Sequence, residues 1–165
     1  MADHLRWGIL GAAKFAREHM APAIHAARGG ALAAIATSSR DKARPFHDLA
    51  PGITVHDSYE ALLADPSIDA VYIPLPNALH VEWSQKAAEA GKHILCEKPL
   101  ALRTDELGDV IRAFRAQQSA ALMVGYNRRF AAMTRRLRAF LDDIQGPLIM
   151  EYRVNAGYIS LDNWV

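Results

Sequence analysis

The chain has 165 residues, of which 51% are hydrophobic, and its formal net charge is +1 at pH 7. This length suffices for one full domain and the start of another, and the near-neutral charge argues against nucleic acid or an anionic membrane as a partner. The single cysteine, Cys96, excludes an internal disulfide and suits a reducing compartment. We find neither a signal sequence nor an apolar run of the ~18 residues that a membrane span needs, so we expect a soluble, cytoplasmic protein.

Short apolar strands alternate with helical patterns along the first 125 residues. The predicted strands cover residues 5–10, 31–37, 53–56, 68–76, 93–96 and 121–125. The predicted helices between them cover residues 14–28, 40–50, 57–65, 77–92 and 104–118. Strands that alternate with helices pair in parallel, because right-handed crossovers return to the same edge of the sheet. We therefore predict an α/β fold, a doubly wound parallel sheet of six strands.

Capping residues and prolines add expectations for the helix ends. Pro22 is expected to bend or interrupt the first helix, and Pro45 to break the second. Asp57 or Ser58 is expected to cap the third helix, and Asn77 to cap the fourth.

The pattern changes after residue 125. An amphipathic helix over residues 128–145 precedes a single long predicted strand over residues 146–159. We therefore divide the chain into a first domain, residues 1–125, and the start of an incomplete second α/β domain, residues 126–165. Because a strand without its sheet exposes its edges, we expect residues 146–165 to be poorly ordered or to pair with another chain in a homo-oligomer.

The stretch "WGILGAAKFA" ends the first predicted strand and opens the first helix, where a dinucleotide-binding fold places its phosphate turn. Small residues let backbone N–H groups approach a pyrophosphate, and the helix N-terminus favours its negative charge. Gly11, Ala13 and Ala16 occupy the three positions of G-x-G-x-x-G. This match is degenerate, so a strand–helix turn without a ligand remains the alternative.

The stretch "TSSRDK" after the second strand bears on the choice of cofactor. Thr37, Ser38 and Ser39 are neutral and Arg40 is cationic, where an acidic residue would bind the ribose of NAD. Hydroxyl groups and a guanidinium favour a 2′-phosphate, so we predict NADP over NAD. Asp41 is expected to open the following helix.

Three further stretches follow carboxyl ends of predicted strands, where ligands bind in such sheets. They are "IPLPN", "CEKP" and "GYNRR". Lys98 can exchange a proton with a substrate hydroxyl, and Glu97 can orient it or bond to the cofactor; a surface Glu–Lys pair is the alternative. His80 lies one turn after Asn77, either near the substrate or as an ordinary first-turn histidine. The histidines show no metal-ligand spacing, so we expect no metal.

Together, "WGILGAAKFA", "SSRD", "SYEALLADPSIDAVYIPLPNALH", "AAEAGKHILCEKPLA" and "MVGYNRRF" resemble the glucose-fructose oxidoreductase / inositol dehydrogenase / rhizopine-catabolism (Gfo/Idh/MocA) family. The resemblance implies an NAD(P)-binding Rossmann domain and hydride transfer between a nicotinamide and a hydroxyl or keto group of a sugar or polyol. It implies that Lys98 is the catalytic lysine and that Glu97 lies near the nicotinamide ribose. The cofactor-binding positions that it implies are Gly11, Ala12, Ala13, Lys14, Phe15, Ser38, Ser39, Arg40, Pro74, Leu75, Asn77, His80, Glu97, Lys98 and Asn127.

The sequence departs from this family in length. Members are about twice as long, and a later aspartate and histidine that complete their site have no counterpart before Val165. We therefore expect the cofactor-binding half of an enzyme, inactive by itself. The alternatives are a non-catalytic dinucleotide sensor or scaffold of the same fold, and an interaction module acting through the arginine-rich helix and the last strand.

Overall fold

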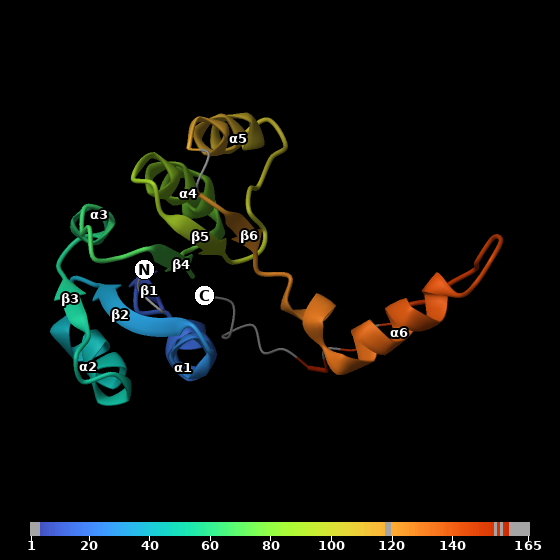
Figure 1. Ribbon diagram of the computed structural model, residues 1–165, viewed down its shortest axis with the longest axis horizontal. Coiled ribbons are helices and arrows are strands. Elements are labelled where there is room, and N and C mark those ends of the chain that lie inside the picture. The colour runs from blue at the N-terminus through green and yellow to red at the C-terminus, as the bar shows by residue number, and fades with distance from the viewer. Residues whose placement is uncertain (1–3, 118–119, 154, 156, 159–165) are drawn as a thin grey trace. The chain divides into compact units, whose positions relative to one another are not determined.

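The computed structural model describes residues 4–117, 120–153, 155 and 157–158. The chain divides into two compact units, Met1–Tyr126 and Asn127–Val165, and each is described by itself. The first unit is built on a sheet of six parallel strands in the order β3-β2-β1-β4-β5-β6 (Figure 1). This is the strand order of a dinucleotide-binding fold, and it confirms the predicted doubly wound parallel sheet.

The elements of the first unit follow the predicted alternation. They are β1 (Leu5–Leu10), the π-helical turn η1 (Ala16–Met20), α1 (Ala21–Ala26), β2 (Gly30–Ala36), α2 (Arg40–Leu49), β3 (Thr54–His56), α3 (Tyr59–Leu63), β4 (Ala70–Ile73), the 3-10 turn η2 (Asn77–Leu79), α4 (His80–Glu89), β5 (His93–Cys96), α5 (Leu107–Ala116) and β6 (Leu122–Val124). All six strands predicted for this unit are present. The fourth is shorter than predicted and ends at the residue before Pro74.

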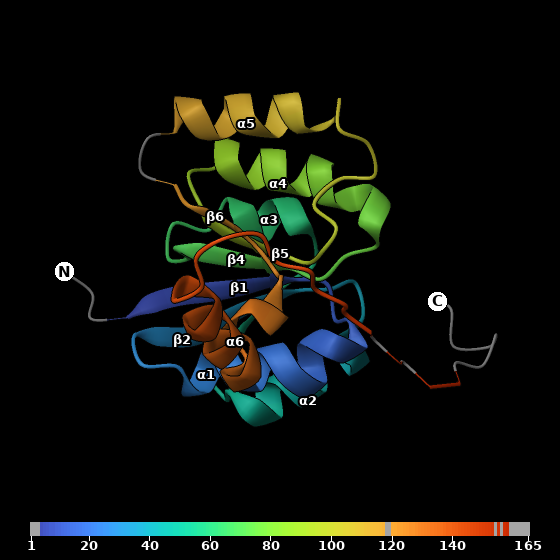
Figure 2. The same ribbon diagram turned by 90° about the vertical axis from the view of Figure 1, so that its right-hand side faces the viewer.

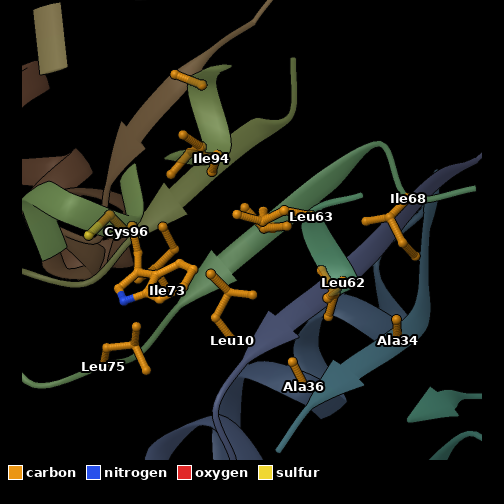
Figure 3. Packing of buried hydrophobic residues seen from close by; sticks show 14 of the residues in the cluster. Leu10, Ala34, Ala36, Leu62, Leu63, Ile68, Ile73, Leu75, Ile94 and Cys96 are labelled. Atoms are coloured by element: carbon orange, nitrogen blue, oxygen red, sulfur yellow. The ribbon is translucent and has the colours of Figure 1, made fainter. Parts of the chain in front are cut away.

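Helices cover both faces of the sheet (Figure 2), and buried side chains form a core on each face. Successive strand residues point to opposite faces, so Ile9 and Tyr72 join the core beside α1 and α2, while Leu10 and Ile73 join the core beside α3 and α4. Figure 3 shows the second core, where Leu62 of α3 lies over the strands. Because both faces are covered, a central strand such as β4 is buried at all four positions, and such strands are rich in hydrophobic residues.

The helix starts agree only partly with prediction. Ser58 is the cap of α3, since its Oγ accepts a hydrogen bond from Ala61 N at 3.0 Å. Pro22 falls in the first turn of α1, directly after η1, so the helical geometry changes there as expected. The side chain of Asn77 does not cap α4, because η2 intervenes and no side-chain cap bond forms; this prediction is wrong.

Pro45 does not break α2, which corrects another prediction. Proline in a helix removes one backbone hydrogen bond, but the buried residues Ala43 and Phe46 anchor the helix on both sides of it. The Ser39 side chain also caps the start of the helix, accepting from Lys42 N at 3.4 Å. Core packing therefore outweighs the local cost of the proline.

The second unit contains a 3-10 turn, η3 (Asn127–Phe130), and α6 (Ala132–Asp142). The predicted helix is thus present in two pieces. The long strand predicted over 146–159 is wrong for the residues described there, 146–153, 155 and 157–158, none of which is in a strand. A strand needs a neighbour for its backbone groups, and the described part of this unit has none. The remaining positions of that prediction lie outside the described residues.

Among the described residues, no helix combines the length and apolar character that a membrane crossing requires.

Candidate cofactor and active site

A cleft of about 290 Å³ opens at the carboxyl ends of β1, β2 and β4. This is where the strand order of the sheet reverses, and ligands of open α/β sheets bind at such a point. Loops that follow the three strands line the cleft, together with Lys42 and Tyr59. The full lining is Gly11, Ala12, Ala13, Thr37, Ser38, Lys42, Tyr59, Pro74, Leu75 and Pro76.

The turn after β1 is shaped by Gly11. Its φ is +92°, a conformation that residues with a Cβ rarely adopt. A Cβ added there would lie 3.0 Å from Leu75 Cδ2 and 3.2 Å from the hydroxyl oxygen of Tyr59, so a side chain would also occupy the cleft. Ala16, at the last of the three small positions, is fully buried, which lets the helical segment pack closely on the sheet.

The backbone beyond Gly11 fits a phosphate group. The N–H groups of Ala12 and Ala13 donate to no acceptor within the described residues, although both residues line the cleft. Their methyl side chains leave room for an anion to approach these donors, as in other backbone phosphate sites. Lys14 and Phe15 follow with exposed side chains.

In the loop after β2, some polar side chains hydrogen-bond to the backbone, and another lines the cleft. Thr37 Oγ1 accepts from Ser39 N at 3.3 Å, and Ser39 Oγ caps α2, so these two hydroxyls serve the backbone. Ser38 is exposed and lines the cleft. Asp41 lies in the first turn of α2, as predicted.

The structure puts a different cation at the cleft from the predicted one. Arg40 lines a separate hollow of about 330 Å³ between α2 and β3, together with Arg44 and His47. Lys42, two residues on, lines the cleft instead, and sequence reasoning missed it. The signal was present in "SSRDK", but only the helical phase of α2 tells which of the two cations faces the cleft.

Glu97 and Lys98 extend the same edge of the sheet. Glu97 N donates to Ile73 O at 3.0 Å, and Gly125 N donates to Cys96 O at 2.7 Å, so the backbone stays paired with its neighbours past the end of β5. Lys98 has an exposed side chain and a cis peptide bond to Pro99. It follows the carboxyl end of β5 as Gly11 follows that of β1, with only β4 between the two strands.

Tyr72 is a site residue that sequence reasoning missed, because it reads as one more apolar residue of a buried strand. It is fully buried, and its hydroxyl donates to Glu97 Oε1 at 2.9 Å. Burial, reinforced by the charge of Glu97, raises the pKa of Tyr72 far above its usual value. The phenol therefore stays protonated and acts as the donor to the carboxylate.

Comparison with known proteins agrees with this geometry. Residues 5–126 match the family described as "Oxidoreductase family, NAD-binding Rossmann fold" (GFO_IDH_MocA). The chain belongs to the Gfo/Idh/MocA family.

Relatives within the Gfo/Idh/MocA family include several proteins named for sugar chemistry. The chain is 42% identical to D-xylose 1-dehydrogenase (NADP(+)) 2 of Haloferax volcanii, over 80% of this chain and 40% of that protein. It is 50% identical to an uncharacterized oxidoreductase of Rhizobium meliloti, over 66% of this chain and 33% of that protein. A crystal structure of a 3-ketoreductase from Actinomadura kijaniata in complex with NADP is similar with a TM-score of 0.77 and 34% identity, over 85% of this chain and 44% of that one. The chain thus spans less than half the length of these family members.

His80, implied by the family resemblance as a cofactor-binding position, is fully buried. Its Nδ1 lies 2.6 Å from Pro99 O, and its Nε2 lies 2.8 Å from Leu75 O. Both ring nitrogens therefore face backbone carbonyl oxygens. His80 thus links the loop after β4 to the loop after β5, and its implied contact with the cofactor stays a prediction.

The other implied positions fall into two groups. Pro74 and Leu75 line the cleft, and Asn77 is exposed one residue beyond its lining. Asn127 belongs to the second unit, where it starts η3.

Proposed function

We propose that the chain is the cofactor-binding part of an NADP-dependent oxidoreductase that interconverts a hydroxyl and a keto group on a sugar or polyol. The observation that carries this proposal is the cleft at the strand reversal, which no Asp or Glu lines among the described residues, with Lys98 at the same edge of the sheet. The NADP(+)-dependent xylose dehydrogenase and the NADP-bound ketoreductase support it.

Different residues of the cleft bind different parts of the cofactor. The N–H groups of Ala12 and Ala13 bind the pyrophosphate. Ser38 and Lys42 bind the 2′-phosphate, since a hydroxyl donor and an ammonium group both favour it. When bound, the nicotinamide accepts or supplies the hydride.

Lys98 moves the proton in this proposal. Among the described residues, no carboxylate oxygen lies within 4.0 Å of its ammonium nitrogen, so this exposed side chain is available to a substrate hydroxyl. In the oxidation direction the amine accepts the hydroxyl proton, and in the reduction direction the ammonium returns it. Glu97 supplies acceptor oxygens at the same strand end.

We further propose that turnover needs residues outside these 165, which would supply most contacts to the substrate. The short span of the relatives' length supports this. Exposed apolar side chains on α6, such as Met133 and Phe140, favour association of the second unit with such residues or with a second copy in a homo-oligomer. A cytoplasmic location suits the single free cysteine.

Reversing one charge in the cleft tests the cofactor preference. In Lys42→Glu, a carboxylate would repel a 2′-phosphate, so NADPH affinity should fall by at least about tenfold, or ~1.4 kcal/mol, while NADH affinity stays within about twofold. Calorimetric titration of the 165-residue chain measures both constants.

Arg44→Glu is the matched control, because it makes the same charge change on the same helix but lies in the other hollow. Equal losses of NADPH affinity in the two variants would contradict a role for Lys42 in the cleft. Failure of the unchanged chain to bind either dinucleotide would overturn the proposed function.

A further inference from the structure

Glu97 and Lys98 are adjacent in the sequence at the edge of the sheet where the cleft lies, but the structure keeps their charged groups apart. Glu97 and Lys98 are neighbours at the end of β5, yet no ion pair within 4.0 Å joins their side chains. Sequence neighbours in this chain do form such pairs elsewhere, since Arg17 Nη2 lies 2.9 Å from Glu18 Oε1. Adjacency alone therefore does not explain the separation.

The Glu97 carboxylate has a hydrogen-bond partner other than Lys98, and this contact accounts for the separation of the two charged groups. The hydroxyl of Tyr72, a fully buried residue of β4, donates to Glu97 Oε1 at 2.9 Å. Within the described residues this is the one side-chain donor to that carboxylate; its other contact is a long one, 3.4 Å from Lys98 N to Oε2. A hydrogen bond to a charged group is among the stronger ones in a protein.

Gly125 provides the space into which the carboxylate is drawn. The residue is buried just beyond β6, and a Cβ added there would lie 3.2 Å from Glu97 Oε1 and 3.4 Å from its Cδ. The contact with Oε1 is tighter than about nine in ten real Cβ contacts, so the neighbouring atoms would have to shift by a few tenths of an ångström. An alanine at this position would push the carboxylate away from the place where Tyr72 holds it.

We propose that Tyr72 is a positioning residue, which holds the Glu97 carboxylate away from the adjacent Lys98 ammonium and so keeps that amine free to react. Without the hydroxyl, Glu97 loses its fixed donor and turns toward Lys98, the cationic residue next to it in the sequence. An ion pair favours the protonated form of an amine, so a smaller fraction of it is unprotonated at a given pH and able to act as a nucleophile or accept a proton. That catalysis needs a free amine rests on the proposed function, but the separation of the Glu97 and Lys98 side chains does not.

The test compares the reactivity of lysines in the 165-residue chain without cofactor. Limiting acetic anhydride at pH 8 acetylates unprotonated amines, and peptide mass spectrometry gives the ratio of modified Lys98 to modified Lys14. In Tyr72→Phe, which removes only the hydroxyl, we expect this ratio to fall by about two- to fivefold, the range of a solvent-exposed ion pair. The double variant Tyr72→Phe/Glu97→Gln should restore it to the value of Glu97→Gln alone.

A purely structural role for the hydroxyl would lower thermal stability and leave the ratio unchanged, and that result overturns the proposal. Gly125→Ala perturbs the same carboxylate from the β6 side and should lower the ratio in the same direction, so it provides the test if Tyr72→Phe does not fold. Because the measurement uses no dinucleotide, a chain that fails to bind NADPH would overturn the proposed function and leave this result standing.

Discussion

At residue 11, the backbone conformation and the available space both require glycine. Gly11→Ala should lower the free energy of unfolding by about 1–2 kcal/mol, because alanine is strained at positive φ and its Cβ would press on Leu75 and Tyr59. NADPH binding should weaken as well, since the new methyl group enters the cleft. Urea denaturation and calorimetric titration measure the two effects.

Gly52→Ala is the control for this substitution. Gly52 has no atom within 4 Å of an added Cβ and does not have a positive φ, so stability should stay within about 0.5 kcal/mol. If Gly11→Ala were as stable as Gly52→Ala and bound NADPH equally well, the turn would not be the phosphate site.

Single residues were predictable where chain position alone decides their place. Gly11, Glu97 and Lys98 directly follow strands, so the strand prediction brought them to one edge of the sheet. Lys42 and His80 depend on the direction in which a helical side chain points, and a shift of two residues along a helix moves a side chain to another face. Tyr72 looks apolar in the sequence, and only the position of its hydroxyl reveals its contact with Glu97.

Between elements, one buried lysine joins β5 to the connection between α3 and β4. Lys92 is 7% exposed, and its Nζ donates to Asp65 O and Ile68 O, each at 2.7 Å. Burial lowers the pKa of this ammonium group, and the two carbonyl oxygens compensate for the lost water. The start of β5 is therefore fixed at the end of the sheet opposite to Lys98.

Lys92→Met should lower the free energy of unfolding by about 2–3 kcal/mol, because it leaves two carbonyl groups without their donor. Lys86→Met, at a partly exposed position of α4, should cause only a small change, since Lys86 pairs with the solvent-exposed Glu82 and Glu60 and such surface ion pairs contribute little. Urea denaturation of both variants measures this. Similar losses in the two would show that the buried contacts of Lys92 do not stabilise the connection.

Elements were predictable wherever both the local pattern and the packing favoured the same structure. The six strands alternate with helices because each is an apolar segment of strand length between helical patterns. α2 continues through Pro45 because the buried Ala43 and Phe46 outweigh a local signal. The strand predicted over 146–159 failed in its described residues, since an apolar, β-prone segment does not form a strand without a neighbour to pair with.

For the molecule as a whole, the strand order determines which residues come together at the proposed site. The parallel order β3-β2-β1-β4-β5-β6 brings the ends of three strands to one cleft and the end of a fourth, with Lys98, to the same edge. The sequence predicts this fold class and edge from alternation alone. It does not predict the lining of the cleft or the buried contacts behind it, because both depend on side-chain directions that no periodicity determines.

The most direct test of the account is to map NADPH binding on the backbone amides of the 165-residue chain by NMR. The account predicts the largest shifts at residues 11–13, 38–42 and 75, around the carboxyl ends of β1, β2 and β4, and small shifts at Arg44 and His47. Shifts confined to the hollow between α2 and β3, or no shifts at millimolar NADPH, would contradict it.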